Sequence, residues 1–471
     1  MNKVAAIIGG GVIGGGWAAR FALMGWEVRV FDPDPEAERK ISEVMGNAGR
    51  VLPMLYEAPM PKRGQMRLVE TVDEAVTGAD WIQESVPERL DIKHRVIAEI
   101  QGTCPEGAVL ASSTSGFKPS ELQEGAARPG QIVVAHPFNP VYLLPLIELV
   151  PSAACDDAIV ARAKDILTGI GMYPLHVRAE IDAHIADRFL EAVWREALWL
   201  VKDGIATTEE IDNAIRYGFG LRWAQMGLFE TYRVAGGEAG MRHFMAQFGP
   251  CLQWPWTKLT DVPEFTDELV DLIASQSDAQ SGHMGIRDLE RLRDNNLVAI
   301  LRGLKQQGAA AGKLILDHDA VLRGPLADEV PLVTVQRVVP VDWTDMNGHM
   351  NEGRYGQLFS DASEELMTHV GADRAYVEAG NSYFTAETTI KYLNETHAGE
   401  DIYVTTRVTL GEGKKLRLWH EMCRASDDAL LATCDQFLLH VSLKTRRSCP
   451  PLPEVLEAIE TLALRHAEAG A

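Results

Sequence analysis

VAAIIGGGVIGGGWAARFALMG, residues 4–25, is an apolar run, a glycine-rich turn and a second apolar stretch with helical spacing. Within it, Gly9, Gly11 and Gly14 form the pattern GxGxxG. Glycine suits these places because a side chain would block the tight turn, the approach of a pyrophosphate to the backbone, and the packing of helix on sheet. N–H groups at the helix start, at Val12 and Ile13, favour phosphate. The stretch predicts a dinucleotide-binding strand–turn–helix unit.

An acidic residue follows at the distance that this unit requires. Asp32 ends the next apolar run, 18 residues after Gly14. A carboxylate there accepts hydrogen bonds from both ribose hydroxyls and repels a 2′-phosphate. The sequence therefore favours NAD over NADP.

The spacing of apolar residues changes along the chain. Residues 1–183 alternate short apolar runs with helical stretches, which is typical of a doubly wound α/β domain. Residues 184–325 repeat apolar positions at helical spacing, which predicts an all-helical domain. We expect this domain to bind substrate and to dimerise. After a segment with two prolines, DHDAVLRGPLADEVP at 317–331, strands return around one helix near 355–370. We expect a third, mostly antiparallel α+β domain at 330–471.

Composition limits the class of ligand. The 471 residues carry 45 Lys and Arg against 67 Asp and Glu, a net charge of -22, which disfavours nucleic acid and anionic membranes. Small-molecule substrates are favoured. The start of the chain lacks a leader pattern and no apolar run reaches membrane-spanning length, so we expect a cytoplasmic protein. The six cysteines show no CxxC or histidine pairing, so neither a metal site nor a disulfide framework is expected.

A second group of polar residues lies near the ends of later strands, where an open α/β sheet places its ligands. Ser115 lies in ASSTSG, His136 and Asn139 in VVAHPFNP, and Glu148 in PLIELV. Oxidation of a hydroxyl group needs a base for its proton, and imidazole titrates in the useful range. A carboxylate behind the imidazole would fix its tautomer. His136 and Glu148 are therefore the candidate base and its partner, although sequence spacing alone does not bring them together.

These motifs resemble the 3-hydroxyacyl-CoA dehydrogenase family over about the first 320 residues. GGGVIG with Asp32, ESVPERLDIK, SSTS, HPFNP and the downstream glutamate match in order. The resemblance implies that Glu88 and Lys93 lie along the cofactor, and that Ser115 and Asn139 hold the reacting oxygen or the carboxamide. It also implies His136 with Glu148 as the catalytic pair.

Departures from the family narrow the substrate. Asp187, in AHIADRFLEA, stands where the family has asparagine, and the segment between Asp32 and Glu84 is short for a CoA-gripping insertion. A carboxylate near aromatic side chains would suit a cationic substrate. The stretch YGFGLRWAQMGLFET also resembles the subgroup that contains L-carnitine dehydrogenases and a lens crystallin. Further substrate-side candidates are Tyr142, Phe219 and, for a substrate carboxylate, Arg222.

The C-terminal domain has its own polar cluster, VDWTDMNGHMNEG, just before the expected helix. Asp345, Asn347 and His349 supply a carboxylate and polar groups next to helix N–H donors, as hydrolysis of a thioester requires. DMNGHMN resembles the signature of hot-dog thioesterases over about 330–450. The resemblance implies Asp345 as the leading catalytic residue, with Asn347 and His349 positioning water or the carbonyl group and Glu395 assisting. Trp343 replaces the first carboxylate that some members carry.

Together the resemblances imply NAD-dependent oxidation of L-carnitine to 3-dehydrocarnitine, and hydrolysis of betainyl-CoA to glycine betaine and CoA, by a homodimer. Three alternatives stay open. The front part could oxidise gulonate or 3-hydroxybutyryl-CoA beside a thioesterase of different specificity. It could instead be a structural protein that binds the cofactor, and the C-terminal domain could only dimerise.

Overall fold

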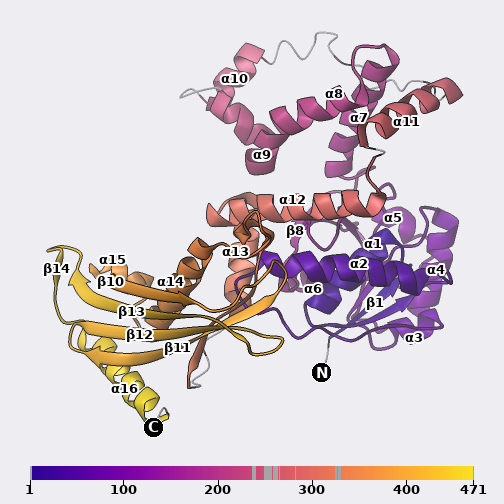
Figure 1. Ribbon diagram of the computed structural model, residues 1–471. Helices are drawn as coiled ribbons and strands as arrows, with labels where there is room; N and C mark the ends of the chain where they lie inside the picture. The colour runs from indigo at the N-terminus through magenta and orange to yellow at the C-terminus, as the bar shows by residue number, and fades with distance from the viewer. Residues whose placement is uncertain are drawn as a thin grey trace. The chain divides into compact units, whose positions relative to one another are not determined.

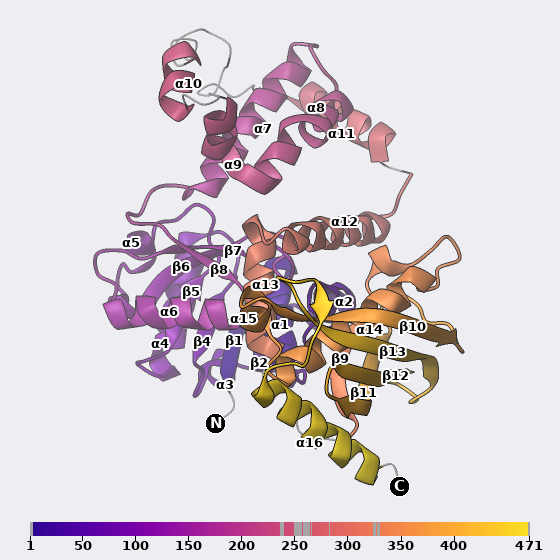
Figure 2. The same ribbon diagram turned by 90° about the vertical axis from the view of Figure 1, so that its left-hand side faces the viewer.

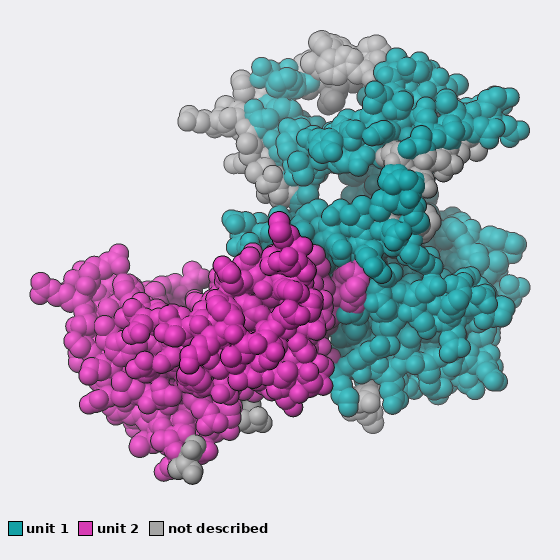
Figure 3. Space-filling view, in the orientation of Figure 1, with its two compact units in different colours: residues 1–49, 62–314 teal, residues 50–61, 315–471 magenta. Residues whose placement is uncertain are grey.

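The computed structural model describes residues 3–235, 240–248, 257, 264, 266–281, 283–323, 326 and 330–469. The chain forms two compact units. The first contains residues 1–49 and 62–314, and the second contains residues 50–61 and 315–471 (Figure 3). Among the described residues, no helix combines the length and apolar character that crossing a membrane would take.

The first unit is built on an eight-stranded sheet with the strand order β3-β2-β1-β4-β5-β6-β7-β8. The neighbouring pairs are parallel except β6 with β7, which are antiparallel. The strands are β1 (Val4–Ile8), β2 (Glu27–Phe31), β3 (Met66–Leu68), β4 (Trp81–Glu84), β5 (Val109–Ser112), β6 (Ile132–Pro137), β7 (Leu146–Val150) and β8 (Tyr173–His176). The central strands β1, β4 and β5 are buried throughout, and β1 is accordingly a continuous apolar run.

Helices cover both faces of this sheet (Figures 1 and 2). On one face, apolar residues of α3 and α4 form a core with alternate residues of β1, β4, β5 and β6. On the other face, Trp17 of α1 packs against Trp81 of β4, with ring centroids 6.0 Å apart. The helices are α1 (Val12–Leu23), α2 (Ala37–Val51), α3 (Val72–Val76), α4 (Leu90–Thr103), α5 (Pro119–Leu122) and α6 (Asp157–Gly169). This is the expected doubly wound arrangement.

The rest of the first unit is helical. Its helices are α7 (Ala186–Lys202), α8 (Thr208–Ala214), α9 (Gly220–Ala235), α10 (Gly240–Phe248), α11 (Asp267–Ser281), α12 (Ile286–Gln306) and the start of α13 (Ala310–Arg323). A π-helical turn at Ile215–Phe219 joins α8 to α9. The side chain of Thr207 caps α8 by accepting a hydrogen bond from the backbone N–H of Glu210.

The second unit is a curved antiparallel sheet that packs against α14 (Glu352–His369) (Figure 1). The sheet has the order β10-β13-β12-β11-β9, with β14 beside β13. Its strands are β9 (Leu332–Val338), β10 (Asn381–Tyr392), β11 (Asp401–Glu412), β12 (Lys415–Arg424), β13 (Leu430–Ser442) and β14 (Arg447–Ser448). The short helix α15 (Arg374–Glu378) precedes β10, and α16 (Pro453–Ala469) packs along β11. One helix against a long curved sheet is the expected hot-dog arrangement.

Two further segments belong to the second unit. α13 continues through the first part of segment 317–331, to Arg323. Residues 50–61, which belong in sequence to the first domain, group with the second unit. Within that unit, the backbone N–H groups of Glu57 and Ala58 donate to Oδ1 of the buried Asp319, at 2.8 and 2.6 Å.

Candidate active sites

The antiparallel pairing of β6 with β7 places His136 directly opposite Glu148. Nδ1 of His136 lies 3.1 Å from Oε2 of Glu148. Both side chains are buried, and Glu148 is completely so. Directly opposite residues of two strands are close neighbours, which explains how a sequence separation of 12 produces a contact. The structure therefore brings together the two residues that the sequence suggested as a pair.

The second carboxylate oxygen of Glu148 contacts the start of α7. Oε1 accepts hydrogen bonds from the backbone N–H groups of Ile185, at 2.8 Å, and Ala186, at 2.9 Å. Burial alone would raise the pKa of Glu148, but the hydrogen bonds from His136 and from these two N–H groups outweigh it and lower the pKa. An ionised Glu148 keeps the proton of His136 on Nδ1 and leaves Nε2 free to accept another.

Asp187 lies next to that free nitrogen, in the first turn of α7. Its Oδ2 is 3.8 Å from Nε2 of His136. Burial is the main cause that raises the pKa of Asp187, and the nearby Glu148 adds to it. The imidazole of His136 therefore stands between two carboxylates, one on each ring nitrogen. The two carboxylates place negative charge on both sides of the ring, which favours a cationic group beside it.

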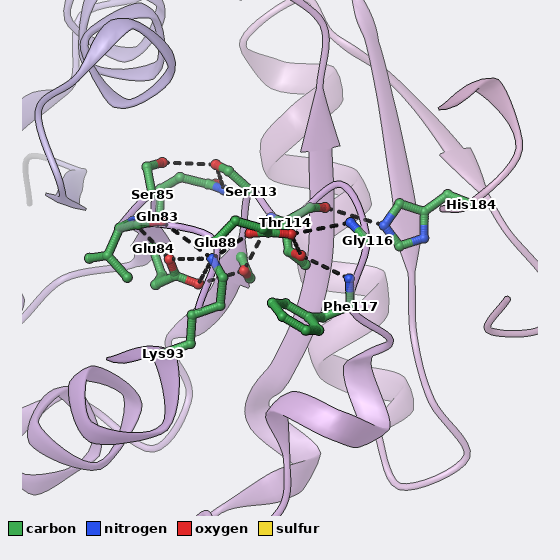
Figure 4. Close-up of polar contacts among 12 residues, drawn as sticks. Gln83, Glu84, Ser85, Glu88, Lys93, Ser113, Thr114, Gly116, Phe117 and His184 are labelled. Carbon is green, nitrogen blue, oxygen red and sulfur yellow. Dashed lines mark hydrogen bonds and ion pairs between the residues drawn. The ribbon is translucent and has the colours of Figure 1, made fainter. Parts of the chain in front are cut away.

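His184 is a neighbour of this group that the sequence analysis missed. It is fully buried, its Nε2 lies 3.2 Å from the carbonyl oxygen of Thr114, and its ring centroid is 5.5 Å from that of His136 (Figure 4). Ala183 and His184 both have positive φ, 58° and 53°, so the chain turns sharply before α7. The signal was present in AHIADRF, where only Asp187 was considered.

The glycine turn has the open space that a dinucleotide needs. A Cβ on Gly9, whose φ is +98°, would lie 2.6 Å from the carbonyl oxygen of Ser85, and one on Gly14 would lie 1.8 Å from that of Gly9. A Cβ on Gly11 would meet nothing within 4 Å, and the next residue, Val12, is 61% exposed. Gly9 and Gly14 thus shape the turn, while Gly11, Val12 and Ile13 lie at the start of α1, where a pyrophosphate fits.

Asp32 lies directly after β2, beside the same turn. Its Oδ2 accepts a hydrogen bond of 2.5 Å from the N–H of Gly10, and its Oδ1 accepts one of 2.8 Å from the N–H of Asp34. These bonds hold the carboxylate beside the glycine turn. The arrangement fits the expected contact with the ribose of NAD.

A buried lysine joins two glutamates near the ends of β4 and β5 (Figure 4). Lys93 of α4 is 1% exposed; its Nζ lies 2.9 Å from Glu84 and 3.1 Å from Glu88. Glu88 also accepts hydrogen bonds from the hydroxyl of Thr114 and the N–H of Gly116. Burial would raise the pKa of Glu88, but the contacts with Thr114 and Lys93 lower it. The network fixes the loop after β5; sequence analysis named Glu88 and Lys93 but not Glu84.

Ser115 and Asn139 lie on the two loops that follow β5 and β6. Both are exposed, and neither side chain makes a hydrogen bond within the described part of the chain. The structure thus leaves both side chains available to a ligand.

The three other substrate-side candidates are not joined to this group. The hydroxyl of Tyr142 donates to Oδ2 of Asp294 in α12 at 2.8 Å, and burial together with Asp294 raises the pKa of Tyr142. The ring of Phe219 packs 4.7 Å from that of Trp223, and Arg222 is exposed on α9. Within the described residues, no hydrogen bond, ion pair or ring contact joins any of the three to His136.

In the second unit, Asp345 organises the loop before α14. Its Oδ1 accepts hydrogen bonds from the N–H groups of Asn347, at 2.8 Å, and His349, at 3.3 Å. The backbone N–H of Asn347 is the main cause that lowers the pKa of Asp345. Nε2 of His349 lies 3.5 Å from Oε2 of Glu395. The loop therefore gathers Asp345, Asn347, His349 and Glu395, as expected.

Trp343 has a structural position in this loop. It is buried in the core between α14 and the sheet, and the guanidinium of Arg337 lies 4.3 Å from its ring centroid. Arg337 in turn pairs with Asp361 of α14, at 3.1 Å. The tryptophan that replaces the first carboxylate of some hot-dog enzymes thus anchors the loop through packing and a cation–π contact.

Comparison with family models agrees with this division of the chain. Residues 4–181 match the model of the 3-hydroxyacyl-CoA dehydrogenase NAD-binding domain, and residues 184–262 match that of the C-terminal domain of the same family. Residues 339–459 match the thioesterase-like superfamily. The preference for NAD and the three fold types expected from the sequence are confirmed.

Individual proteins extend the match over the whole chain. An "L-carnitine dehydrogenase/betainyl-CoA thioesterase" of Ruegeria pomeroyi is 65% identical, over 99% of this chain and 96% of that protein. An "L-carnitine dehydrogenase" of Mesorhizobium japonicum is 60% identical over 68% of this chain and 88% of its own length. The crystal structure of an NAD-dependent 5-formyl-3-hydroxy-2-methylpyridine 4-carboxylic acid 5-dehydrogenase, 28% identical, covers 65% of this chain and 99% of its own, with a TM-score of 0.54. The chain belongs to the family of bifunctional L-carnitine dehydrogenase/betainyl-CoA thioesterases.

Proposed function

We propose that the first unit oxidises L-carnitine to 3-dehydrocarnitine with NAD, and that the second hydrolyses betainyl-CoA to glycine betaine and CoA. The observation that carries the first half is the buried pair His136–Glu148 with Asp187 on the other ring nitrogen. The identity with relatives named for both activities supports the assignment of substrates.

In the dehydrogenase, Nε2 of His136 accepts the proton of the substrate hydroxyl. NAD, when bound, supplies the ring that takes the hydride from the same carbon. Glu148 stabilises the imidazolium through Nδ1, and its lowered pKa keeps it ionised for that task. Ser115 and Asn139, whose side chains make no hydrogen bond among the described residues, orient the reacting oxygen or the nicotinamide carboxamide.

Asp187 provides the specificity for a cationic substrate. Carnitine carries a trimethylammonium group, which has no N–H to donate and is therefore recognised by charge and by aromatic faces. A carboxylate beside the reacting position attracts such a group, whereas an amide does not. Tyr142, Phe219 and Arg222 complete the proposed substrate side, with Arg222 paired to the carboxylate of carnitine.

The cofactor is held by the turn and the network described above. Gly9, Gly11, Val12, Ile13 and Gly14 receive the pyrophosphate, Asp32 accepts the ribose hydroxyls, and Glu88 and Lys93 lie along the nicotinamide half. The clearance at Gly11 and the exposed start of α1 support this assignment.

In the thioesterase, Asp345 activates water, or attacks directly, at the carbonyl carbon of betainyl-CoA. The C–S bond breaks, CoA leaves as the thiol and the acyl group becomes the carboxylate of glycine betaine. Asn347 and His349 position the water or the carbonyl group, and N–H groups at the start of α14 polarise the carbonyl oxygen. The hydrogen bonds that both residues donate to Asp345 support these roles.

We further propose three functional domains, 1–183, 184–325 and 330–471, in a cytoplasmic homodimer. The edges of the matched family models support the division. The edge strand β10 supports dimerisation, because one of its sides has no partner among the described strands and a second copy can pair there. The step that joins the two activities, transfer of an acyl group to CoA, requires another protein, so the fusion reflects a shared pathway.

One substrate panel tests both halves. We expect NADH formation at 340 nm to be faster with L-carnitine than with gulonate or 3-hydroxybutyryl-CoA at equal concentration, and absent in His136→Ala at retained affinity for NAD. We expect thiol release from betainyl-CoA by wild type and not by Asp345→Ala. Faster oxidation of gulonate than of L-carnitine would refute L-carnitine as the substrate. Equal thiol release by wild type and Asp345→Ala would leave the C-terminal domain a dimerisation module.

A further inference from the structure

Two histidines and a glutamate form a compact group on the surface of the second unit. His349 and His397 are paired as opposite residues of an isolated antiparallel bridge. Their ring centroids lie 4.9 Å apart, and Glu395 precedes His397 by two residues. The possible ligand atoms of the three side chains all lie within 4.8 Å of one another.

Internal contacts leave this group free to bind an ion. His349 meets Glu395 at 3.5 Å, but Nδ1 of His397 reaches only to 3.9 Å from Glu400. That oxygen of Glu400 already accepts the hydroxyl of Thr396 at 2.7 Å and the N–H of His397 at 3.0 Å. Nε2 of His397 makes no hydrogen bond within the described residues. The side chains of His349, Glu395 and His397 are 38, 63 and 47% exposed, so an ion reaches them from solvent.

We propose that His349, Glu395 and His397 bind one transition-metal ion of the zinc class. Two imidazoles and one carboxylate are a ligand set that such ions prefer, whereas calcium and magnesium take oxygen ligands. The backbone bridge holds the two histidines next to one another. Three protein ligands leave at least one position open to water.

The site is coupled to the thioesterase loop through His349. The imidazole of His349, which would position water or the carbonyl group in the proposed hydrolysis, becomes a metal ligand, and the backbone N–H of His349 donates to Asp345. A bound ion therefore lowers the rate of thioester hydrolysis. Cysteine spacing could not indicate this site, because its ligands are histidines 48 residues apart with a glutamate.

Direct binding tests the site without any substrate. The untagged full-length chain is titrated with Co²⁺, followed by visible absorption, and with Zn²⁺, followed by calorimetry. We expect one ion per chain at this site, and loss of one ligand in His397→Ala to weaken binding at least about tenfold. The matched control is His283→Ala, which removes an exposed histidine of the first unit and should leave binding unchanged.

A second variant and a second readout keep the test decisive. Glu395→Gln removes the anionic ligand at nearly constant shape, and it replaces His397→Ala if that variant loses its circular dichroism spectrum. Equal affinity and stoichiometry in wild type and in the folded variants would overturn the proposal.

The effect on hydrolysis rests on the proposed thioesterase. We expect Zn²⁺ to inhibit thiol release from betainyl-CoA in wild type, with at least about tenfold less sensitivity in His397→Ala, and to leave NADH formation by the same chain unchanged. Metal binding with unchanged hydrolysis would refute the coupling. Absent hydrolysis in metal-free wild type would refute the proposed thioesterase and not the site.

Discussion

Asp187 decides, at the scale of one residue, which 3-hydroxy acid the first unit prefers. Its carboxylate lies 3.8 Å from Nε2 of His136, and burial raises its pKa. In Asp187→Asn we expect the ratio of kcat/KM for L-carnitine to that for 3-hydroxybutyrate to fall at least about tenfold, which is about 1.4 kcal/mol. The reason is that the amide keeps the shape but removes the charge that attracts trimethylammonium. Initial rates of NADH formation with both substrates give the ratio.

The control for this change is Glu191→Gln, which removes the same charge one turn further along α7. Glu191 pairs loosely with Arg195, at 3.7 Å, and has no contact with His136 in the described residues. An equal fall of the ratio in both variants would mean that Asp187 acts only through general charge.

Glu148 fixes which ring nitrogen of His136 carries the proton. Because it accepts three hydrogen bonds in a fully buried place, Glu148→Gln turns an acceptor into a partial donor against N–H groups. We expect kcat to fall by about 10²–10⁴ with KM little changed, since the substitution impairs proton transfer.

Glu148 also makes stability depend on pH. In the folded protein its pKa lies below 4.5, so the stability that ionised Glu148 contributes is present above pH 4.5 and is lost as pH falls through that lowered pKa. Urea unfolding of both proteins at pH 7 and pH 4 measures this difference; a constant difference would contradict the assignment.

At the scale of elements, the sequence predicted strands that are buried on one face or on both, and it missed β10, which is buried on neither. β1, VAAII, is a continuous apolar run, and in β2, EVRVF, buried valines alternate with half-buried residues. β10, NSYFTAETTIKY, lies at a sheet edge with exposed or half-buried residues throughout, so neither an apolar run nor an alternation indicated it. The grouping of His349 with His397 could not be predicted either, because it depends on a backbone bridge between two segments far apart in the sequence.

The start of α14 depends on Asn351. Its side-chain oxygen accepts a hydrogen bond of 2.9 Å from the N–H of Gly353, as an N-cap does. We expect Asn351→Ala to lower the free energy of unfolding of the second unit by about 1 kcal/mol, and Asn351→Ser, which restores an oxygen acceptor, to recover most of it. Urea unfolding at pH 7.5 compares the three proteins. Equal losses in both variants would show that the side chain acts in another way.

His420 makes the stability of the second unit depend on pH. It is fully buried on β12, with Nδ1 2.8 Å from the hydroxyl of Thr406, and burial lowers its pKa from 6.5 to about 4. The unfolded chain therefore binds a proton at a higher pH than the folded one. Its contribution to stability is fully present above pH 6.5 and is lost as pH falls to 4; the two pKa values correspond to about 3 kcal/mol.

We expect the urea midpoint of wild type to fall between pH 7.5 and 5 by more than that of His420→Gln, which has no titrating group at this place. His283→Gln, a change at an exposed histidine, should follow wild type. Parallel pH dependence in wild type and His420→Gln would contradict the assignment.

At the scale of the whole molecule, the spacing of apolar residues predicted the order of the three fold types. It did not predict which segments of the chain group into each unit. Residues 50–61 group with 315–471 although no pattern in their sequence marks them. Their contacts are made one pair at a time: Tyr56 with His318, at 3.1 Å, and Glu57 with Asp319 and with Arg337. These contacts form only in the folded chain, and no pattern in the sequence indicates them.

These contacts predict where the chain can be cut. A fragment ending at Leu314 leaves Tyr56 without His318, and the N–H groups of Glu57 and Ala58 without Asp319. A fragment ending at Arg323 keeps all three contacts and loses the ion pair of Glu57 with the buried Arg337, and the Mesorhizobium japonicum dehydrogenase matches the chain over a comparable length of 323 residues. Each buried donor left without an acceptor costs about 1–3 kcal/mol.

We therefore expect residues 1–323 to oxidise L-carnitine with kcat within about twofold of the full chain, because the cut spares every residue proposed for that reaction. Residues 1–314 should unfold at lower urea concentration or fail to remain soluble. Equal urea midpoints for the two fragments, followed by tryptophan fluorescence at matched concentration, would show that residues 50–61 are held by something other than the buried Asp319 and His318.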